Sequence, residues 1–180
     1  PDNTIFEELV YSYETLAKRA KELSFLNRGL TIIMTDERET NKDGTFKTET
    51  FHSEGGLKEF VLHLDATRPS ILTEPIYVTG RDEKENVEVE VAMQYNTSYQ
   101  EHIHSYVNNI NTREGGTHVN GFRRAVTREF KKYADDNGLL SKLEKAKISI
   151  TGEDFREGLT AVVSVKVPEP QFKGQTKGEL

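Results

Sequence analysis

The run from Thr160 to Val167 constrains the fold of this chain more than any other segment of its sequence. β-branched residues occur at both odd and even positions of the run, so apolar side chains would point to both faces of a strand. A strand of that kind needs cover on both faces of its sheet. We therefore expect a central strand here, with the rest of the fold built around it.

Several other segments have the pattern of strands that could pair with it. Val87, Val89 and Val91 alternate with glutamates, which is typical of a half-buried strand. The polar stretch Asp36–Thr50 predicts a hairpin with its tip around Asn41–Gly44. Shorter strands are predicted at Leu30–Thr35, Ile76–Thr79 and Ile103–Val107.

The first helix is predicted close to the beginning of the chain. Thr4 and Glu7 fit a capping box, and Gly29 supplies a stop. Between them, apolar residues recur at three- and four-residue steps, as on one face of a helix. These residues are Ile5, Phe6, Leu9, Val10, Tyr13, Leu16, Ala17, Ala20 and Leu23.

Two further long helices are predicted, and together with the strands they define a fold class. Gly55-Gly56 opens a helix that runs to about Ala66. Another runs from Thr117 to about Asn137, before a shorter one at Leu139–Lys145. This mixed order of helices and strands predicts an α+β fold, a two-layer α/β sandwich with helices layered on one sheet.

The composition fits one folded domain of 180 residues, of which 34% are apolar and 30% are charged. The absence of cysteine excludes disulfides and thiolate chemistry and is compatible with a reducing cytoplasm. No apolar run is long enough to span a membrane. A formal net charge of −6 argues against nucleic-acid binding through overall charge, although a local basic patch is compatible with it. Because the first residue is Pro1 and not Met, we expect a fragment of a longer chain.

The segment Gly116–Gly121 matches the glycine spacing of a phosphate-binding P-loop but not its chemistry. Phe122 and Arg123 stand where a P-loop needs Lys and Ser or Thr, so nothing is placed to bind a β- or γ-phosphate or magnesium. We interpret the segment as a tight turn that caps and starts the helix at Thr117. An anion site at the helix N-terminus is the alternative.

Two polar groups could imitate metal or catalytic sites. His102 and His104 would point to one face of a strand, but a metal needs three or four ligands, so His118 or Glu101 would have to complete the site. We favour a solvated strand face and predict no metal site. The second group consists of carboxylates around Arg156, which we interpret as stabilising a turn through that local arginine. They are Glu153, Asp154 and Glu157.

The helix predicted from Thr117 carries a basic surface. At about 100° per residue, Arg124, Arg128 and Lys131 fall on one side of it. The simplest interpretation is a solvated face. Arg123 differs, because it lies beside the apolar stripe, so its side chain either extends past the edge of the core or points into a cavity. The stripe that we expect to face the core consists of Phe122, Val126, Phe130 and Tyr133.

Three runs in the last part of the chain, in this order, resemble the second domain of the bacterial DNA gyrase B family and of its topoisomerase IV relatives. That domain is called the transducer. The runs are Asn108–His118 (NNINTREGGTH), Arg156–Val167 (REGLTAVVSVKV) and Pro168–Lys177 (PEPQFKGQTK). The segments Phe25–Asn27 and Ser53–Gly56 also fit, so the resemblance covers essentially the whole chain.

The resemblance implies a specific fold and a division of the chain. The fold is that of the second domain of ribosomal protein S5, with a left-handed βαβ crossover, an exception to the usual handedness. Residues 1–180 would form a single transducer domain. Residues 1–168 would be its folded body, and residues 169–180 a loop that carries Gln175-Thr176-Lys177 toward an ATP-binding domain absent from this chain. Without that docking partner we expect the loop to be mobile.

For function, the resemblance implies a part of an ATP-dependent type II DNA topoisomerase. From the sequence alone, a polar tail with one lysine is a flexible terminus. In the family, the Gln and Lys of this tail contact the γ-phosphate, which implies Lys177 as the catalytic residue and Gln175 and Lys177 as nucleotide-binding residues. ATP and Mg²⁺ would be bound mainly by the absent domain, so we expect this chain alone to bind no cofactor and to be inactive.

The resemblance also implies the other partners. The arginine after Gly-Phe in this family faces the central hole through which the transported duplex passes. Arg123 is therefore the best candidate for a DNA contact, with Arg124 and Arg128 as weaker ones. The further partners would be the gyrase A subunit and a second copy of the B subunit, in the cytoplasm and without membrane contact.

Two other functions compete with this one. The first is a stand-alone nucleic-acid-binding or scaffolding module of S5-like fold without ATP coupling, which would use the face from Arg123 to Lys132 and bind DNA in a salt-dependent way. The Gln175-Thr176-Lys177 tail argues against it, because such a module has no use for that loop. The second is a free-standing hydrolase using His118 and Glu114, which lacks a positioned nucleophile and a cofactor motif.

Overall fold

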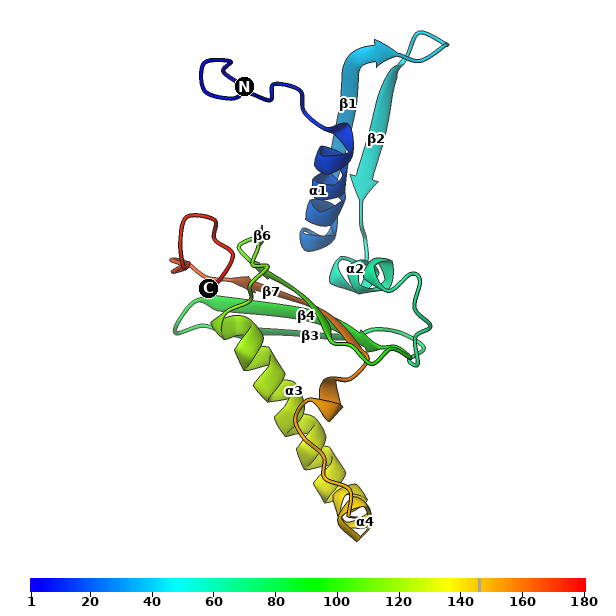
Figure 1. Cartoon of the computed structure of the whole chain (residues 1–180), viewed down its shortest axis with the longest axis vertical. Coiled ribbons are helices and arrows are strands. Elements are labelled where there is room, and N and C mark those ends of the chain that lie inside the picture. The colour runs from blue at the N-terminus through cyan, green and yellow to red at the C-terminus, as the bar shows by residue number, and fades with distance from the viewer. Residues whose placement is uncertain (146) are drawn as a thin grey trace. The chain divides into compact units, whose positions relative to one another are not determined.

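The structure is a computed structural model that describes residues 1–145 and 147–180, with the backbone only for residues 142–144. The chain divides into two compact units, residues 1–59 and 60–180, and the boundary falls inside helix α2 (Leu57–Leu64). Figure 1 labels most of the elements of both units.

The first unit consists of helix α1 (Tyr13–Leu26) packed on an antiparallel hairpin of β1 (Thr31–Thr40) and β2 (Phe46–His52). At the tip, Gly44 has the left-handed backbone conformation that the turn requires, with φ at 83°. The predicted hairpin and its tip are confirmed. The buried residues of the helix are Tyr13, Ala20, Ser24, Phe25 and Leu26.

The predicted start of the first helix is wrong. Ser12 is the N-cap of α1, because its side-chain oxygen accepts a hydrogen bond from the Thr15 N–H at 3.3 Å. Thr4 is held in a separate turn, where its N–H and its hydroxyl donate to the Asp2 carboxylate at 2.8 and 2.7 Å. The apolar residues between these two turns have helical spacing but are exposed and outside the helix. They are Ile5, Phe6, Leu9 and Val10.

The second unit is built on a five-stranded mixed sheet with the strand order β3-β4-β7-β5-β6. Its strands are β3 (Ile76–Asp82), β4 (Val87–Tyr95), β5 (His102–Val107), β6 (Ile110–Asn111) and β7 (Leu159–Lys166). The helices that follow β6 are α3 (Thr117–Asp136), α4 (Leu139–Lys145) and the 3₁₀ turn η1 (Asp154–Arg156).

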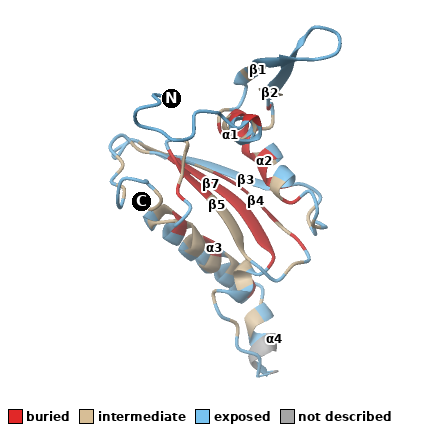
Figure 2. Cartoon of the chain, turned by 45° about the horizontal axis from the view of Figure 1, so that its top comes forward, coloured by how far each residue is buried: buried red, intermediate tan, exposed pale blue. Residues whose placement is uncertain are grey.

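The predicted central strand is confirmed as β7. It pairs antiparallel with β4 and parallel with β5, and every residue from Leu159 to Val165 is buried. Figure 2 shows β7 and part of β4 as the buried centre of the sheet. The β-branched residues at successive positions therefore pack on both faces, as their pattern indicates.

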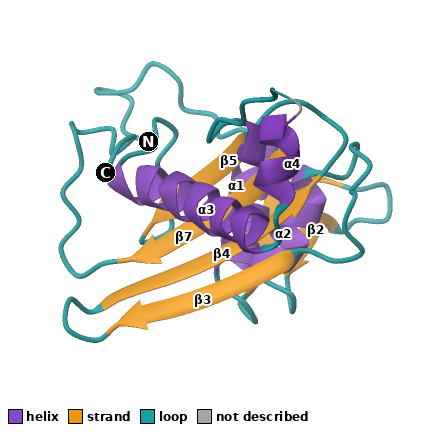
Figure 3. Cartoon of the chain, turned by 90° about the horizontal axis from the view of Figure 1, so that it is seen from below, coloured by secondary structure: helices purple, strands orange, loops and turns teal. Residues whose placement is uncertain are grey.

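Helices cover the two faces of this sheet. α3 lies across one face, as Figure 3 shows. On the opposite face, the ring of Phe60 in α2 packs on Tyr106 in β5, with 5.9 Å between ring centroids. α3 and its neighbours connect β5 to its parallel neighbour β7, which makes a βαβ crossover whose hand stays a prediction. The mixed α/β class is confirmed.

The cover on the α3 face is incomplete. An apolar groove of about 640 Å³ lies between α3 and strands β3, β4 and β7, lined among others by Val91, Val163 and Phe122. α3 continues past the end of the sheet toward α4 (Figure 1). Tyr133 lies near that end and is 64% exposed, so its predicted place in the core is wrong. No helix in the described parts of the chain is both long and apolar enough to cross a membrane.

Candidate functional site

The loop predicted to contact nucleotide follows β7. The segments on either side of its tip, which we call its arms, pair with each other through Lys173 and Glu179. The Lys173 N–H donates to the Glu179 carbonyl oxygen at 2.9 Å, and Nζ of Lys173 lies 2.9 Å from the Glu179 carboxylate. This ion pair raises the pKa of Lys173. The two arms therefore close the loop, and Gly174–Lys177 forms its tip.

Lys177 occupies a strained position at that tip. Its φ is 55°, in the left-handed region, where a residue with a Cβ is less stable than glycine by about 1 kcal/mol or more. Its N–H donates to the Gly174 carbonyl oxygen at 3.4 Å, and its Nζ lies 5.8 Å from the centroid of the Phe172 ring. Both Lys177 and Gln175 are exposed. The tip thus presents an ammonium group and an amide to solvent.

The three arginines predicted to contact DNA all lie on α3, in different environments. Arg124 and Arg128 are exposed, and Nε of Arg128 lies 2.8 Å from the exposed Glu129 carboxylate. Arg123 is less accessible, with 40% of its side chain exposed, and is paired within the fold. Arg124 and Arg128 are therefore accessible on the surface of α3, whereas Arg123 is held in an ion pair within the fold.

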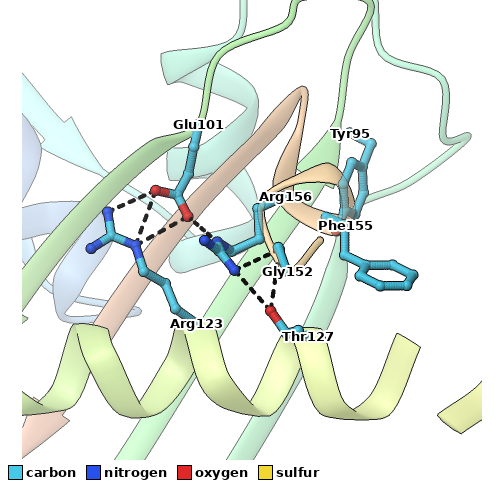
Figure 4. A network of polar contacts seen from close by, with 7 residues as sticks. All are labelled: Tyr95, Glu101, Arg123, Thr127, Gly152, Phe155 and Arg156. Carbon is cyan, nitrogen blue, oxygen red and sulfur yellow. Dashed lines mark hydrogen bonds and ion pairs between the residues drawn. The ribbon is translucent and has the colours of Figure 1, made fainter. Parts of the chain in front are cut away.

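Arg123 shares a carboxylate with a second arginine (Figure 4). Its Nε donates to both carboxylate oxygens of Glu101 at 3.1 and 3.0 Å, and its Nη2 donates to Oε2 at 2.7 Å. Nε of Arg156 donates to Oε1 of the same carboxylate at 2.8 Å. The bonds from Arg123 to Glu101 do not involve Nη1, so that nitrogen is the donor best placed for a further anion.

Arg156 is fixed more firmly than Arg123. Its Nη1 donates to the Thr127 hydroxyl at 2.8 Å and to the Gly152 carbonyl oxygen at 2.6 Å, and only 16% of its side chain is exposed. Its carboxylate partner is Glu101, and not the neighbouring acids that the sequence indicated. One of those, Asp154, accepts hydrogen bonds from the backbone and hydroxyl of Thr151, which lower its pKa.

The cleft around this cluster is predominantly acidic. It has a volume of about 520 Å³, and two arginines and four carboxylates line it together with Tyr99. An anion inside the cleft would meet more negative than positive charge. The charged lining residues are Arg123, Arg156, Glu101, Glu153, Asp154 and Glu157.

The predicted helix start at Thr117 is confirmed, and Gly115 and Gly116 before it have φ of 79° and 133°. The predicted turn over Gly116–Gly121 is wrong, because residues 117–121 lie inside α3 and no side chain caps the helix. His118, in the first turn, lies with Nε2 3.0 Å from the Thr112 hydroxyl. Burial lowers the pKa of His118, which keeps the ring neutral near pH 7. His118 is thus half-buried beside the hydrogen-bonded pair of Ser105 and Thr112.

His102 and His104 lie on one face of β5, as their spacing predicts, since they pair with Thr160 and Val162 of β7. The ring of His104 packs near Phe60, with 6.5 Å between centroids. Among the described residues, no group of three or more His, Cys, Asp or Glu side chains is arranged to hold a metal ion. His104 therefore packs on α2, and both histidines are half-buried, so the fully solvated strand face favoured from the sequence is wrong.

Sequence reasoning missed a buried carboxylate, Asp65, which follows α2. It accepts hydrogen bonds from Gln94, Asn96 and Thr160 at 2.7 to 2.9 Å and pairs with Arg68 at 2.8 Å. Burial alone would raise the pKa of Asp65, but these bonds outweigh it and lower the pKa. The signal that could have revealed Asp65 was the pair of amides, Gln94 and Asn96, at the end of the valine-rich strand β4. Buried amides require hydrogen-bond partners.

With this geometry in view, the fold resembles ATPase regions of type II topoisomerases. The crystal structure of the 43K ATPase domain of Thermus thermophilus gyrase B matches with a TM-score of 0.79 and 33% identity, over 99% of this chain and 45% of that one. The topoisomerase IV ATP-binding domain of Francisella tularensis matches with a TM-score of 0.72 and 28% identity, over 99% and 45% of the two chains.

Sequence comparison narrows this class to one family. A family model described as DNA gyrase B matches residues 56–180. The DNA gyrase B protein of Eisenibacter elegans is 60% identical over 180 residues, which are 100% of this chain and 37% of that relative. The chain therefore belongs to the DNA gyrase B family, as its motifs predicted, and spans little more than a third of that relative's length.

Proposed function

We propose that this chain is the transducer domain of an ATP-dependent type II DNA topoisomerase. In this proposal it couples ATP binding and hydrolysis in a neighbouring ATP-binding domain to domain movement and DNA strand passage. Membership of the gyrase B family supports it. So does the likeness to two solved ATPase or ATP-binding domains, of which this chain covers less than half. Residues 1–168 would be the body of the domain and residues 169–180 the loop that reaches its neighbour.

The observation that carries the proposal is the placement of Lys177. An exposed lysine occupies a left-handed position that glycine or asparagine would occupy with less strain, at the tip of a loop closed by the pairing of Lys173 with Glu179. Backbone strain of this kind often clusters at functional sites, so it supports a functional role for Lys177. The loop is thus built to present one ammonium group outside the body of the domain.

The chemistry of ATP hydrolysis gives this ammonium group a role. Negative charge on the phosphoryl oxygens and the leaving group is redistributed as the γ-phosphoryl group passes to water. A fixed cation beside those oxygens stabilises the transition state. We assign this role to Nζ of Lys177, and to Gln175 the hydrogen bond that positions the phosphate. We assign the adenosine and the Mg²⁺ ion to the ATP-binding domain, so this chain alone is expected to be inactive.

Loss of the γ-phosphate would then remove the acceptor that holds Lys177. The loop and the domain that carries it could reposition once that contact is gone, which is the general logic of nucleotide switches. In addition to this nucleotide contact, Arg123, Arg124 and Arg128 on α3 would contact the transported duplex. The remaining partners would be the gyrase A subunit and a second copy of the B subunit, in the cytoplasm.

The test is ATP turnover by the full-length protein that contains this chain. Lys177→Ala is compared with Lys84→Ala, which removes a lysine 90% exposed in the turn between β3 and β4. Lys177→Ala keeps a Cβ at φ 55°, so it removes the ammonium group without changing the backbone strain. We expect kcat to fall about a hundredfold for Lys177→Ala, with a much smaller change in KM, and no change for Lys84→Ala.

Equal turnover by the wild type and Lys177→Ala would contradict the catalytic role. A full-length protein that hydrolyses no ATP at all would also contradict it. The domain would then fit better as a nucleic-acid-binding or scaffolding module of the same fold, and salt-dependent DNA binding by this chain would be its signature.

A further inference from the structure

The base of the Lys177 loop is fastened to the segment that leads into α3. The Glu114 N–H donates to the Gly178 carbonyl oxygen at 2.9 Å, and the Leu180 N–H donates to the Gly115 carbonyl oxygen at 3.1 Å. Glu179 forms a parallel bridge with Gly115. We call this contact between residues 114–117 and residues 178–180 the tail clamp.

The tail clamp also completes α3. The helix has no side-chain N-cap, because its N-cap residue is Gly116. The Thr117 N–H, one of the donors that a helix leaves unsatisfied at its start, donates to the Leu180 carbonyl oxygen at 3.2 Å. The end of the loop thus supplies a backbone acceptor for the first N–H of a helix that lacks a side-chain cap. The loop base and the first turn of α3 are therefore one hydrogen-bonded structure.

Gly116 is the residue that allows the two segments to approach so closely. Its φ is 133°, and a Cβ built on it would lie 2.4 Å from the carbonyl oxygen and 2.6 Å from the nitrogen of Leu180. Both atoms are backbone, so neither can move aside as a flexible side chain could. Gly115 differs, because the nearest atoms to a Cβ there belong to the Val119 side chain at 3.7 Å. Any side chain at position 116 would separate the tail from α3.

We propose that Gly116 is a positioning residue for Lys177. The tail clamp fixes both the place and the direction of the loop that presents the ammonium group, while the tip itself stays exposed. Misplacement of a catalytic group by about 1 Å can reduce turnover a hundredfold, so a residue that holds the loop base acts on catalysis without touching nucleotide. This inference rests on the proposed function of Lys177 and deepens it.

The experiment measures ATP turnover by the full-length protein with Gly116→Ala, Lys177→Ala and both changes together. Gly80→Ala is the control, because Gly80 lies in β3 without a positive φ, and a Cβ added to it would meet no atom within 4 Å. We expect Gly116→Ala to lower kcat at least tenfold, with a smaller change in KM. In the Lys177→Ala background it should cause no further loss, since its effect passes through Lys177.

A second variant disrupts the tail clamp by a change in the tail itself. Leu180→Pro removes the N–H that donates to the Gly115 carbonyl oxygen and leaves the sequence of α3 unchanged. It should reproduce the kcat loss of Gly116→Ala. If Gly116→Ala fails to fold, Leu180→Pro decides the question alone.

The outcomes separate this inference from the proposed function. If Lys177→Ala leaves turnover unchanged, the proposed function fails first. If Lys177→Ala lowers turnover while Gly116→Ala and Leu180→Pro do not, only the positioning role is overturned. Losses that multiply in the double variant would also overturn it, because they would show that Gly116 acts independently of Lys177.

Discussion

At the scale of single residues, Glu101 determines how available Arg123 is to an outside anion. The carboxylate takes three hydrogen bonds from Arg123 and a fourth from Arg156, which the fold holds in place through Thr127 and Gly152. A duplex phosphate that binds Arg123 must therefore share its guanidinium with the Glu101 carboxylate or displace that carboxylate. Glu101 would thus weaken the proposed contact with DNA.

Glu101→Gln removes the charge of this side chain and keeps its size. Affinity of the chain for a short DNA duplex at low salt should rise about two- to fivefold, the scale of a partly exposed ion pair. The dependence of affinity on salt should become steeper. Glu153→Gln is the matched control, because it removes one charge from the same cleft. An equal gain in both variants would show that only net charge matters.

Asp65 gives a prediction about stability. Asp65→Ala leaves the donors of Gln94, Asn96 and Thr160 without their shared acceptor, so the free energy of unfolding should fall by about 3–5 kcal/mol in urea titrations. Asp136→Ala, at the exposed end of α3, should change it little.

The same residue predicts a pH dependence with a definite sign. Because the pKa of Asp65 is lowered in the folded state, the unfolded state binds the proton more readily. Its contribution to stability is therefore complete above the ordinary carboxyl pKa of about 3.9 and is lost as the pH falls through the lowered value. The stability difference between wild type and Asp65→Ala should narrow under acid conditions. A constant gap down to the lowest pH would contradict this.

These residues also show where sequence reasoning ended. Arg123 was singled out by its position beside the apolar stripe, but its partner Glu101 lies in the loop before β5 and carries no local signal of this pairing. Asp65 and the amides of Gln94 and Asn96 are likewise joined only by tertiary contacts. Local spacing describes which face a side chain is on, and not which distant side chain meets it.

At the scale of elements, the two possible starts of α1 can be told apart. Ser12→Ala removes the side-chain acceptor of the Thr15 N–H and should destabilise the first unit by about 1 kcal/mol. Thr4→Ala affects only the turn at Asp2 and should have a much smaller effect. Thermal unfolding of the two variants makes the comparison. A larger loss for Thr4→Ala would restore the longer helix that the sequence predicted.

The contrast between α1 and the sheet explains which elements could be predicted. The strands at Val87–Tyr95 and Leu159–Lys166 were found because alternation and β-branching report burial directly. The residues Ile5 to Val10 continue the helical period of α1, and one acceptable N-cap residue lies at each end of this segment. Periodicity alone could not choose between Thr4 and Ser12, because tertiary packing decides how far a helix extends.

At the scale of the whole molecule, net charge limits how the chain could meet DNA. The chain carries a formal net charge of −6, so any DNA contact depends on the local basic face of α3 and not on the overall field. It spans 37% of its Eisenibacter elegans relative. Within it, the proposed nucleotide contact and the proposed DNA contact are joined by the tail clamp, which makes α3 continuous with the Lys177 loop.

The central claim is that Lys177 touches the γ-phosphate, and nucleotide affinity tests it most directly. Dissociation constants for a non-hydrolysable ATP analogue and for ADP are measured on the full-length protein, as wild type and as Lys177→Ala. A charge-assisted hydrogen bond to the γ-phosphate predicts that Lys177→Ala lowers the preference for triphosphate over diphosphate about tenfold, with ADP affinity unchanged. An unchanged preference, or an equal loss for both nucleotides, would contradict the claim.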